Sequence, residues 1–118
     1  MGDWKADGVF KNKWCFISGA VTGVEDRNKS AFDAVEKWLR KEGATGVFNP
    51  VAVIDKEKSW EDAMRICLHV LIENKYDALV CLPDSLKSCG SALERLVAES
   101  IGIKIFMLKQ STFNKIKA

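Results

Sequence analysis

Four short apolar runs, separated by segments with helical periodicity, constrain the fold of this chain more than any other feature of its sequence. Each run is too short for a helix, and the first three end at glycine or at turns that contain proline, as buried strands do. Between the runs, apolar side chains recur every three or four residues, which indicates surface helices. The predicted strands are residues 14–19, 45–48, 78–82 and 103–108, and the predicted helices end near Gly43, Asn74 and Gly102.

Alternation of strands and helices along the whole chain predicts an α/β fold with helices on both faces of a parallel sheet. We therefore expect a Rossmann-like or flavodoxin-like three-layer sandwich, with a mainly parallel sheet of about four to five strands. A length of 118 residues fits a single domain, residues 1–118, with one core. Residues 1–13 show no clear period and are predicted to form an N-terminal arm, and residues 109–118 a C-terminal tail with one short helical turn.

The charge balance and the cysteines exclude several classes of partner. The 18 basic and 16 acidic residues are interspersed and give a net charge of +2, so neither a nucleic-acid polymer nor a membrane is expected as a partner. No apolar run is long enough to span a membrane, and the N-terminus lacks the apolar core of a signal peptide. The four cysteines form no C-x-x-C pair and His69 is the only histidine. We therefore expect no metal, no cofactor and a reducing, cytoplasmic location.

The segment Ser88-Cys89-Gly90-Ser91-Ala92-Leu93-Glu94 directly follows the turn after the third predicted strand. A helix that opens on Ser, Gly and Ser above a sheet is a typical anion site, because its free N–H groups and the positive end of its dipole point at the crevice. Glu94 lies in the first turn, so its carboxylate is expected at the rim of the crevice, either for chemistry or only as a capping charge. Cys89, beside the helix start, is either a small apolar filler or a reactive thiol.

Other polar loops are predicted to meet at the same crevice, because ligands of parallel sheets bind beyond the carboxyl ends of the strands. These ends carry Ser18-Gly19, Asn49-Pro50 and Pro83-Asp84. Asn28 or Ser30 is predicted to cap the helix after the first strand.

Several motifs occur in a recognisable order between roughly residues 14 and 108. Along the chain they are Phe16-Ile17-Ser18-Gly19, Thr22-Gly23, Asp26-x-Asn28, Ala31-Phe32, Leu39 to Gly43, Asn49-Pro50, Ser59-Trp60-Glu61-Asp62-x-Met64-Arg65, Tyr76-Asp77-Ala78, Leu82-Pro83 and Ser88-x-Gly90-Ser91-x-x-Glu94. In order and spacing they resemble an uncharacterised bacterial and phage family of the nucleoside 2-deoxyribosyltransferase-like superfamily.

The resemblance implies chemistry at the N-glycosidic bond of nucleosides or nucleotides. It makes Glu94 the nucleophile that attacks the anomeric carbon of deoxyribose, as the carboxylate of a retaining glycosidase does. It also implies a phosphate site and a loop that borders the ligand crevice, and it implies assembly into a homo-oligomer. The implied phosphate-binding residues are Ser18, Gly19, Ser88, Gly90 and Ser91, and the loop contains Asn28. The aromatic residues Trp4, Phe10 and Trp14 look exposed in the sequence and would suit the interface.

Two positions depart from the pattern of active transferases of that superfamily. Phe16 stands where they carry a tyrosine that orients the nucleophile, and the position of their helix aspartate falls near Cys67 or His69. His69 is predicted to be solvated, so Asp84 is the predicted replacement acid. Two functions therefore remain open: an N-glycosidic hydrolase or transferase acting on deoxynucleoside 5′-monophosphates or nucleosides, and a non-catalytic nucleotide-binding or nucleotide-sensing module. Trp60 is either a packing lid or a base-stacking platform, and Arg27 either steers a phosphate or is solvated.

Overall fold

A parallel sheet of four strands organises residues 8–118, the part of the chain that the computed structural model describes. The strands are β1 (Trp14–Ser18), β2 (Gly46–Phe48), β3 (Ala78–Cys81) and β4 (Lys104–Met107), and their order in the sheet is β2-β1-β3-β4. All three neighbouring pairs are parallel. The predicted α/β fold is therefore confirmed, with four strands in the sheet.

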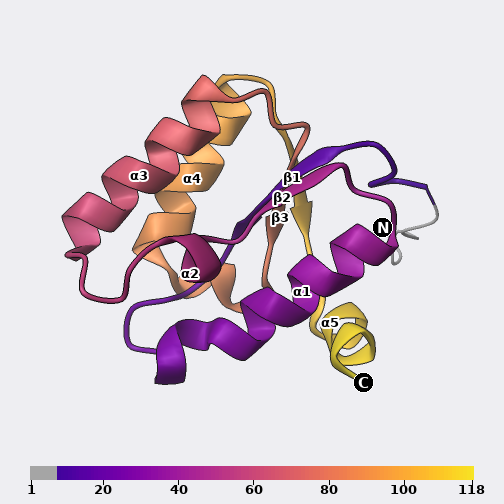
Figure 1. Cartoon of the computed structure of the whole chain (residues 1–118), viewed down its shortest axis with the longest axis horizontal. Coiled ribbons are helices and arrows are strands. Elements are labelled where there is room, and N and C mark those ends of the chain that lie inside the picture. Colours follow the sequence, from indigo (N-terminus) through magenta and orange to yellow (C-terminus); the bar gives the residue numbers. More distant parts are fainter. Residues whose placement is uncertain (1–7) are drawn as a thin grey trace.

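The helices lie on both faces of this sheet (Figure 1). The helices α1 (Lys29–Lys41) and α5 (Gln110–Lys117) cover one face, and α3 (Trp60–Glu73) and α4 (Cys89–Ser100) cover the other. Alternate residues of a strand point to opposite faces, so the strands supply both cores. Ile17 and Val80 pack with α1 and α5, whereas Phe16 and Leu79 pack with α3 and α4.

The strand order places a switch point between β1 and β3. The chain moves from β1 outward to β2, then returns to add β3 and β4 on the other side of β1. The carboxyl ends of β1 and β3 lie side by side there, because Ser18 pairs with Cys81 at the end of the ladder. Crevices of parallel sheets open at such a point.

Short helices occur where the sequence predicts only connections. Helix α2 (Pro50–Val53) follows the second predicted strand, and its start is capped by Asn49, whose Oδ1 accepts from the Val51 N–H at 3.2 Å. Two 3₁₀ helices, η1 (Glu25–Asn28) and η2 (Pro83–Lys87), precede α1 and α4. These elements span four or five residues, which is too short for apolar periodicity to appear. At the C-terminus, α5 spans eight residues rather than the single predicted turn.

Phe10 is buried, so its predicted place at an exposed interface is wrong. Its side chain is 0% exposed and meets the rings of Trp38 and Phe106 edge-on, with centroids 5.6 and 5.0 Å away. Trp14 is 49% exposed, and Trp4 lies outside the described residues.

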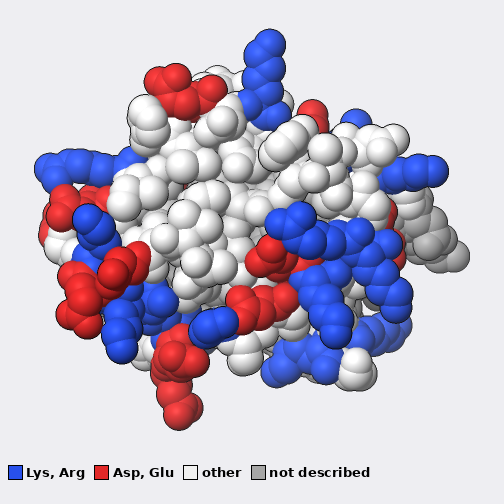
Figure 2. Space-filling model, viewed as in Figure 1, with Lys and Arg blue, Asp and Glu red and all other residues white. Residues whose placement is uncertain are grey.

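Charged side chains of both signs are mixed over the lower part and the sides of the face shown in Figure 2, and an uncharged area lies toward its upper middle. Among the described helices, none has both the length and the apolar character that a membrane span requires.

Candidate functional site

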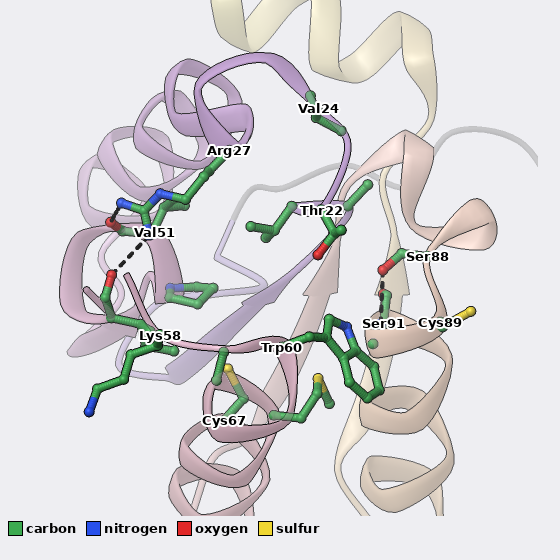
Figure 3. Close-up of a pocket in the computed structure, with 18 of the residues that line it drawn as sticks. Thr22, Val24, Arg27, Val51, Lys58, Trp60, Cys67, Ser88, Cys89 and Ser91 are labelled. Carbon is green, nitrogen blue, oxygen red and sulfur yellow. Dashed lines mark hydrogen bonds between the residues drawn. The ribbon is translucent and has the colours of Figure 1, made fainter. Parts of the chain in front are cut away.

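A cleft of about 830 Å³ opens at the carboxyl ends of β1 and β3 (Figure 3). Its size lies within the range of small-molecule sites, about 300–1,000 Å³. The loop after β1, helix α2 with the connection that follows it, the first turns of α3 and the start of α4 all contribute to its walls. Of the predicted site residues, Gly19, Ser88, Gly90, Ser91 and Glu94 line the cleft, whereas Ser18, Asn28 and Asp84 do not.

The start of α4 forms one wall of the cleft, as the sequence predicts. Ser88 is the N-cap, and its Oγ accepts a hydrogen bond from the Ser91 N–H at 3.1 Å (Figure 3). The next amides, those of Cys89 and Gly90, have no hydrogen-bond acceptor assigned among residues 8–118. Two N–H groups at the positive end of a helix dipole are therefore free for an anion.

Gly90 lets α3 approach this wall closely. A Cβ at Gly90 would lie 3.0 Å from Met64 Sδ and 3.8 Å from Trp60 Nε1. The indole of Trp60, which is 42% exposed, lines the cleft near the start of α4 (Figure 3). Gly19, directly after β1, also has little room for a side chain, because a Cβ there would lie 2.5 Å from Leu82 Cδ1.

Glu94 lines the cleft and is only 5% exposed, so its predicted place at the rim is wrong. Helix α4 begins at Cys89 and has no acidic residue in its first turn, so Glu94 comes one turn later, where the helix packs on the sheet. Its Oε1 accepts a hydrogen bond from the Ser18 hydroxyl at 2.6 Å. The Ser18 Oγ is in turn 2.5 Å from the Ser91 Oγ, which accepts from Arg95 Nη1 at 3.2 Å. The sequence suggested each of these serines as a site residue but not the contacts of Ser18. These contacts join Ser18 to Ser91, 73 positions away, and to Glu94, 76 positions away.

The electrostatics of Glu94 are set by opposing effects. Burial raises the pKa of Glu94 to about 7, and hydrogen bonds from Ser18 and Cys67, together with the Arg95 charge, oppose that rise. The Cys67 thiol lines the cleft on α3, and burial followed by the neighbouring Glu94 charge raises its pKa far above the usual range. Cys67 therefore stays a protonated thiol and is a poor acid.

Asp84 and Asn28 brace the loop after β1 from outside the cleft. Asp84 accepts from the Ala20 N–H at 3.2 Å and from Asn28 Nδ2 at 3.0 Å. Asn28 Nδ2 also donates to the Ala20 carbonyl oxygen at 3.0 Å. Of the two predicted caps of α1, Asn28 occupies the N-cap position and Ser30 lies inside the helix. The backbone of Asn28 is left-handed (φ 61°) and its side chain makes no capping bond to α1. An Asp84 carboxylate held in this way is not directed at a ligand in the cleft.

Arg27 is a cleft residue whose contacts the sequence did not predict. Its guanidinium donates to the carbonyl oxygens of Ile54 at 2.9 Å and Val51 at 3.3 Å, which fastens the loop after β1 to α2 (Figure 3). Asp26, Arg27 and Asn28 have successive positive φ angles of 49°, 54° and 61°. Such a conformation costs energy in residues other than glycine and is maintained by these bonds.

The cleft carries more basic than acidic groups. Its lining includes four cationic side chains, Arg27, Lys56, Lys58 and Lys87, and two carboxyl groups, Asp55 and Glu94. Asn49 does not line it, because its amide instead caps α2 and donates to Asp33 and Glu36 at 2.9 and 3.0 Å. Among the described residues, no group of three or more His, Cys, Asp and Glu side chains is arranged to hold a metal ion.

A protein-family model matches residues 13–107 of the chain. The matching family is described as "Domain of unknown function (DUF4406)". Comparisons with curated proteins and with solved structures found no match.

Proposed function

Because the chain belongs to the DUF4406 family, whose description names no activity, we propose a function from the site itself. The protein is an N-glycosidic hydrolase or 2-deoxyribosyltransferase-like enzyme that acts on deoxynucleoside 5′-monophosphates or nucleosides, with Glu94 as nucleophile. One observation carries the proposal: a carboxylate only 5% exposed lines a large cleft and is oriented by a hydroxyl at 2.6 Å. The resemblance to the deoxyribosyltransferase-like superfamily supports the choice of nucleosides.

The chemistry requires two displacements at the anomeric carbon. In the first, a Glu94 oxygen forms a bond to C1′ while the C1′–N bond breaks, and the base departs with the bonding electrons. A proton from solvent neutralises the departing base. In the second, water or another base attacks C1′, the ester bond breaks and the Glu94 carboxylate is restored. Water gives up one proton to solvent in this step, so the hydrolysis balances.

The charge of the cleft supports a phosphorylated substrate. Its cationic side chains outnumber its carboxyl groups by four to two, and Cys89 and Gly90, whose amides have no assigned acceptor, line the same cleft. A phosphate bound there would receive charge-assisted hydrogen bonds and would leave the sugar within reach of Glu94.

A non-catalytic nucleotide-binding module is the second candidate, and the absence of an acid favours it. Among residues 8–118, the carboxyl groups that line the cleft are Glu94 and Asp55, and the Oδ1 of Asp55 accepts from the Glu57 N–H at 2.8 Å. Without an acid for the leaving base, the first displacement loses help worth ~10²–10⁴-fold in rate.

The experiment is to incubate the protein with each deoxynucleoside 5′-monophosphate and to follow free base by chromatography. Glu94→Gln is the test variant, and Glu99→Gln is the matched control because Glu99 is exposed on the same helix. We expect base from the wild type and the control and none from Glu94→Gln. Thermal stabilisation by nucleotide without base release would instead support the binding module. If neither base release nor stabilisation by nucleotide is observed, both candidate functions are refuted.

Location and assembly belong to the same proposal. The described cysteines Cys15, Cys67, Cys81 and Cys89 are all free thiols, which is consistent with a reducing cytoplasm. Homo-oligomer formation is measurable by light scattering of the purified protein.

A further inference from the structure

We propose that Arg95 is a positioning residue that orients the Glu94 carboxylate through a one-way chain of hydrogen bonds passing through Ser91 and Ser18. The proposal rests on the role of Glu94 given above and assigns the two serine hydroxyls to the carboxylate rather than to a ligand phosphate.

The direction of the chain follows from the chemistry of its two ends. A guanidinium has only donors and an ionised carboxylate has only acceptors. The Ser18 hydrogen is therefore used at Glu94 Oε1, 2.6 Å away, and the Ser18 oxygen must accept from Ser91 at 2.5 Å. The Ser91 oxygen then accepts from Arg95 Nη1 at 3.2 Å. Each hydroxyl gives its single hydrogen toward Glu94.

Burial makes these bonds strong and their geometry fixed. Ser18 and Ser91 are each 1% exposed and Glu94 is 5% exposed, so water competes little with the bonds. Hydrogen bonds to charged groups are shorter and stronger than neutral ones in such surroundings. The Arg95 guanidinium is also held by a bond that is not part of this row of hydrogen bonds, because Nη1 donates to the Ser85 carbonyl oxygen at 3.2 Å.

Local structure explains why these residues meet. Ser91 and Arg95 are four residues apart on α4 and share one helix face. The Ser88 cap fixes the Ser91 backbone at the helix start. Ser18 is the last residue of β1 and its side chain points to the α4 face of the sheet, as that of Phe16 does. Phe16 itself has no donor and stacks on Phe48 with centroids 4.8 Å apart.

The direction of these hydrogen bonds has a consequence for ligand binding. While Glu94 is ionised, neither hydroxyl has a hydrogen to donate to a phosphate. A bound phosphate would therefore use the amides of Cys89 and Gly90 and the basic side chains of the cleft. Removing the Ser91 hydroxyl should raise the titration midpoint of the Glu94 carboxyl and leave nucleotide affinity unchanged.

The test is an NMR titration of the full chain labelled with ¹³C at glutamate Cδ, with the Glu94 signal assigned from its loss in Glu94→Gln. Loss of the Ser18 donor in Ser18→Ala should raise the Glu94 titration midpoint by about 1–2 pH units. Ser91→Ala and Arg95→Met should raise it by a smaller amount, and Arg95→Lys should partly restore it. Ser100→Ala, an exposed serine on the same helix, should leave it unchanged. The other ionisable groups that interact with Glu94 remain in every variant: the Cys67 thiol on α3, which hydrogen-bonds to it, and the Cys81 thiol on β3, which interacts with its charge.

Two results would overturn the proposal. One is a fall in melting temperature in Ser91→Ala and Arg95→Met with the Glu94 titration unmoved, since that marks a purely structural role. The other is a more than tenfold loss of deoxynucleotide affinity in Ser91→Ala with the same unmoved titration, since that marks a phosphate-binding hydroxyl. Ser91→Ala removes one oxygen and adds no volume, so it carries the test even if Arg95→Met fails to fold. The titration needs no turnover, so absence of base release would refute the proposed function without deciding this inference. Where base is released, the pH profile of kcat should move with the titration while KM stays constant.

Discussion

Replacing Glu94 with glutamine should stabilise the protein at pH 8 but hardly at pH 4.5. Glu94 is 5% exposed, and burial raises its pKa from 4.5 to about 7. Between these values the folded protein keeps a proton that the unfolded chain has released, so the free energy of unfolding falls as the pH rises and stays lower above 7. At 1.36 kcal/mol for each pH unit, this penalty at pH 8 is about 3 kcal/mol. Glutamine is uncharged at both pH values and avoids it.

The assay is urea unfolding of the wild type, Glu94→Gln and the control Glu99→Gln at both pH values. The difference in unfolding free energy between Glu94→Gln and the wild type should grow by about 3 kcal/mol from pH 4.5 to pH 8, which corresponds to a melting-temperature change on the order of 10 °C. The control should stay within about 0.5 kcal/mol of the wild type. A difference that is the same at both pH values would show that Glu94 ionises normally in the folded protein, and the burial argument would be refuted.

Three further outcomes follow from the same structure. Base release should increase as the pH rises through about 7, because the nucleophile must be ionised and the pKa of Glu94 is about 7; a rate that falls over this range would exclude Glu94 as nucleophile. Asp84→Ala should cost about 1–2 kcal/mol of stability in thermal unfolding, because it removes the bonds that hold the loop after β1. Its effect should be less than additive with that of Asn28→Ala, whereas unchanged stability with a hundredfold slower base release would make Asp84 an acid. Iodoacetamide at pH 8 should label the exposed Cys89 and spare Cys67, which is buried and whose pKa is raised; mass spectrometry that finds Cys67 labelled first would contradict its burial.

The parts of the site that depend on neighbouring residues could be predicted from the sequence, and those that depend on sheet order could not. The helix start at Ser88 and the presence of Glu94 in the cleft follow from a pattern seven residues long. The depth of Glu94 does not, because it lies beyond the first turn of α4 and is buried rather than at the rim. The bond from Ser18 to Glu94 joins residues 76 positions apart and exists only because β1 and β3 are neighbours and α4 follows β3. The strand ends were expected to meet, but the sequence does not tell where a side chain points once there. Asp84 illustrates this limit, since it lies at the predicted edge yet bonds to Ala20 and Asn28 rather than lining the cleft.

The energetics of Glu94 bear on why a carboxylate occupies this position. Its ionised form lowers the stability of the fold at neutral pH. An uncharged side chain of similar size at this position of α4 would give a higher free energy of unfolding. Ser18 and Cys67 donate hydrogen bonds that limit the rise in its pKa, which keeps a substantial ionised fraction near pH 7. A catalytic group works best when its pKa lies near the working pH, and strongly perturbed pKa values are concentrated at functional sites. A carboxylate that is costly to the fold, opens onto a cleft of about 830 Å³ and is supported by donors from β1 and α3 is best explained by a role in binding or reaction.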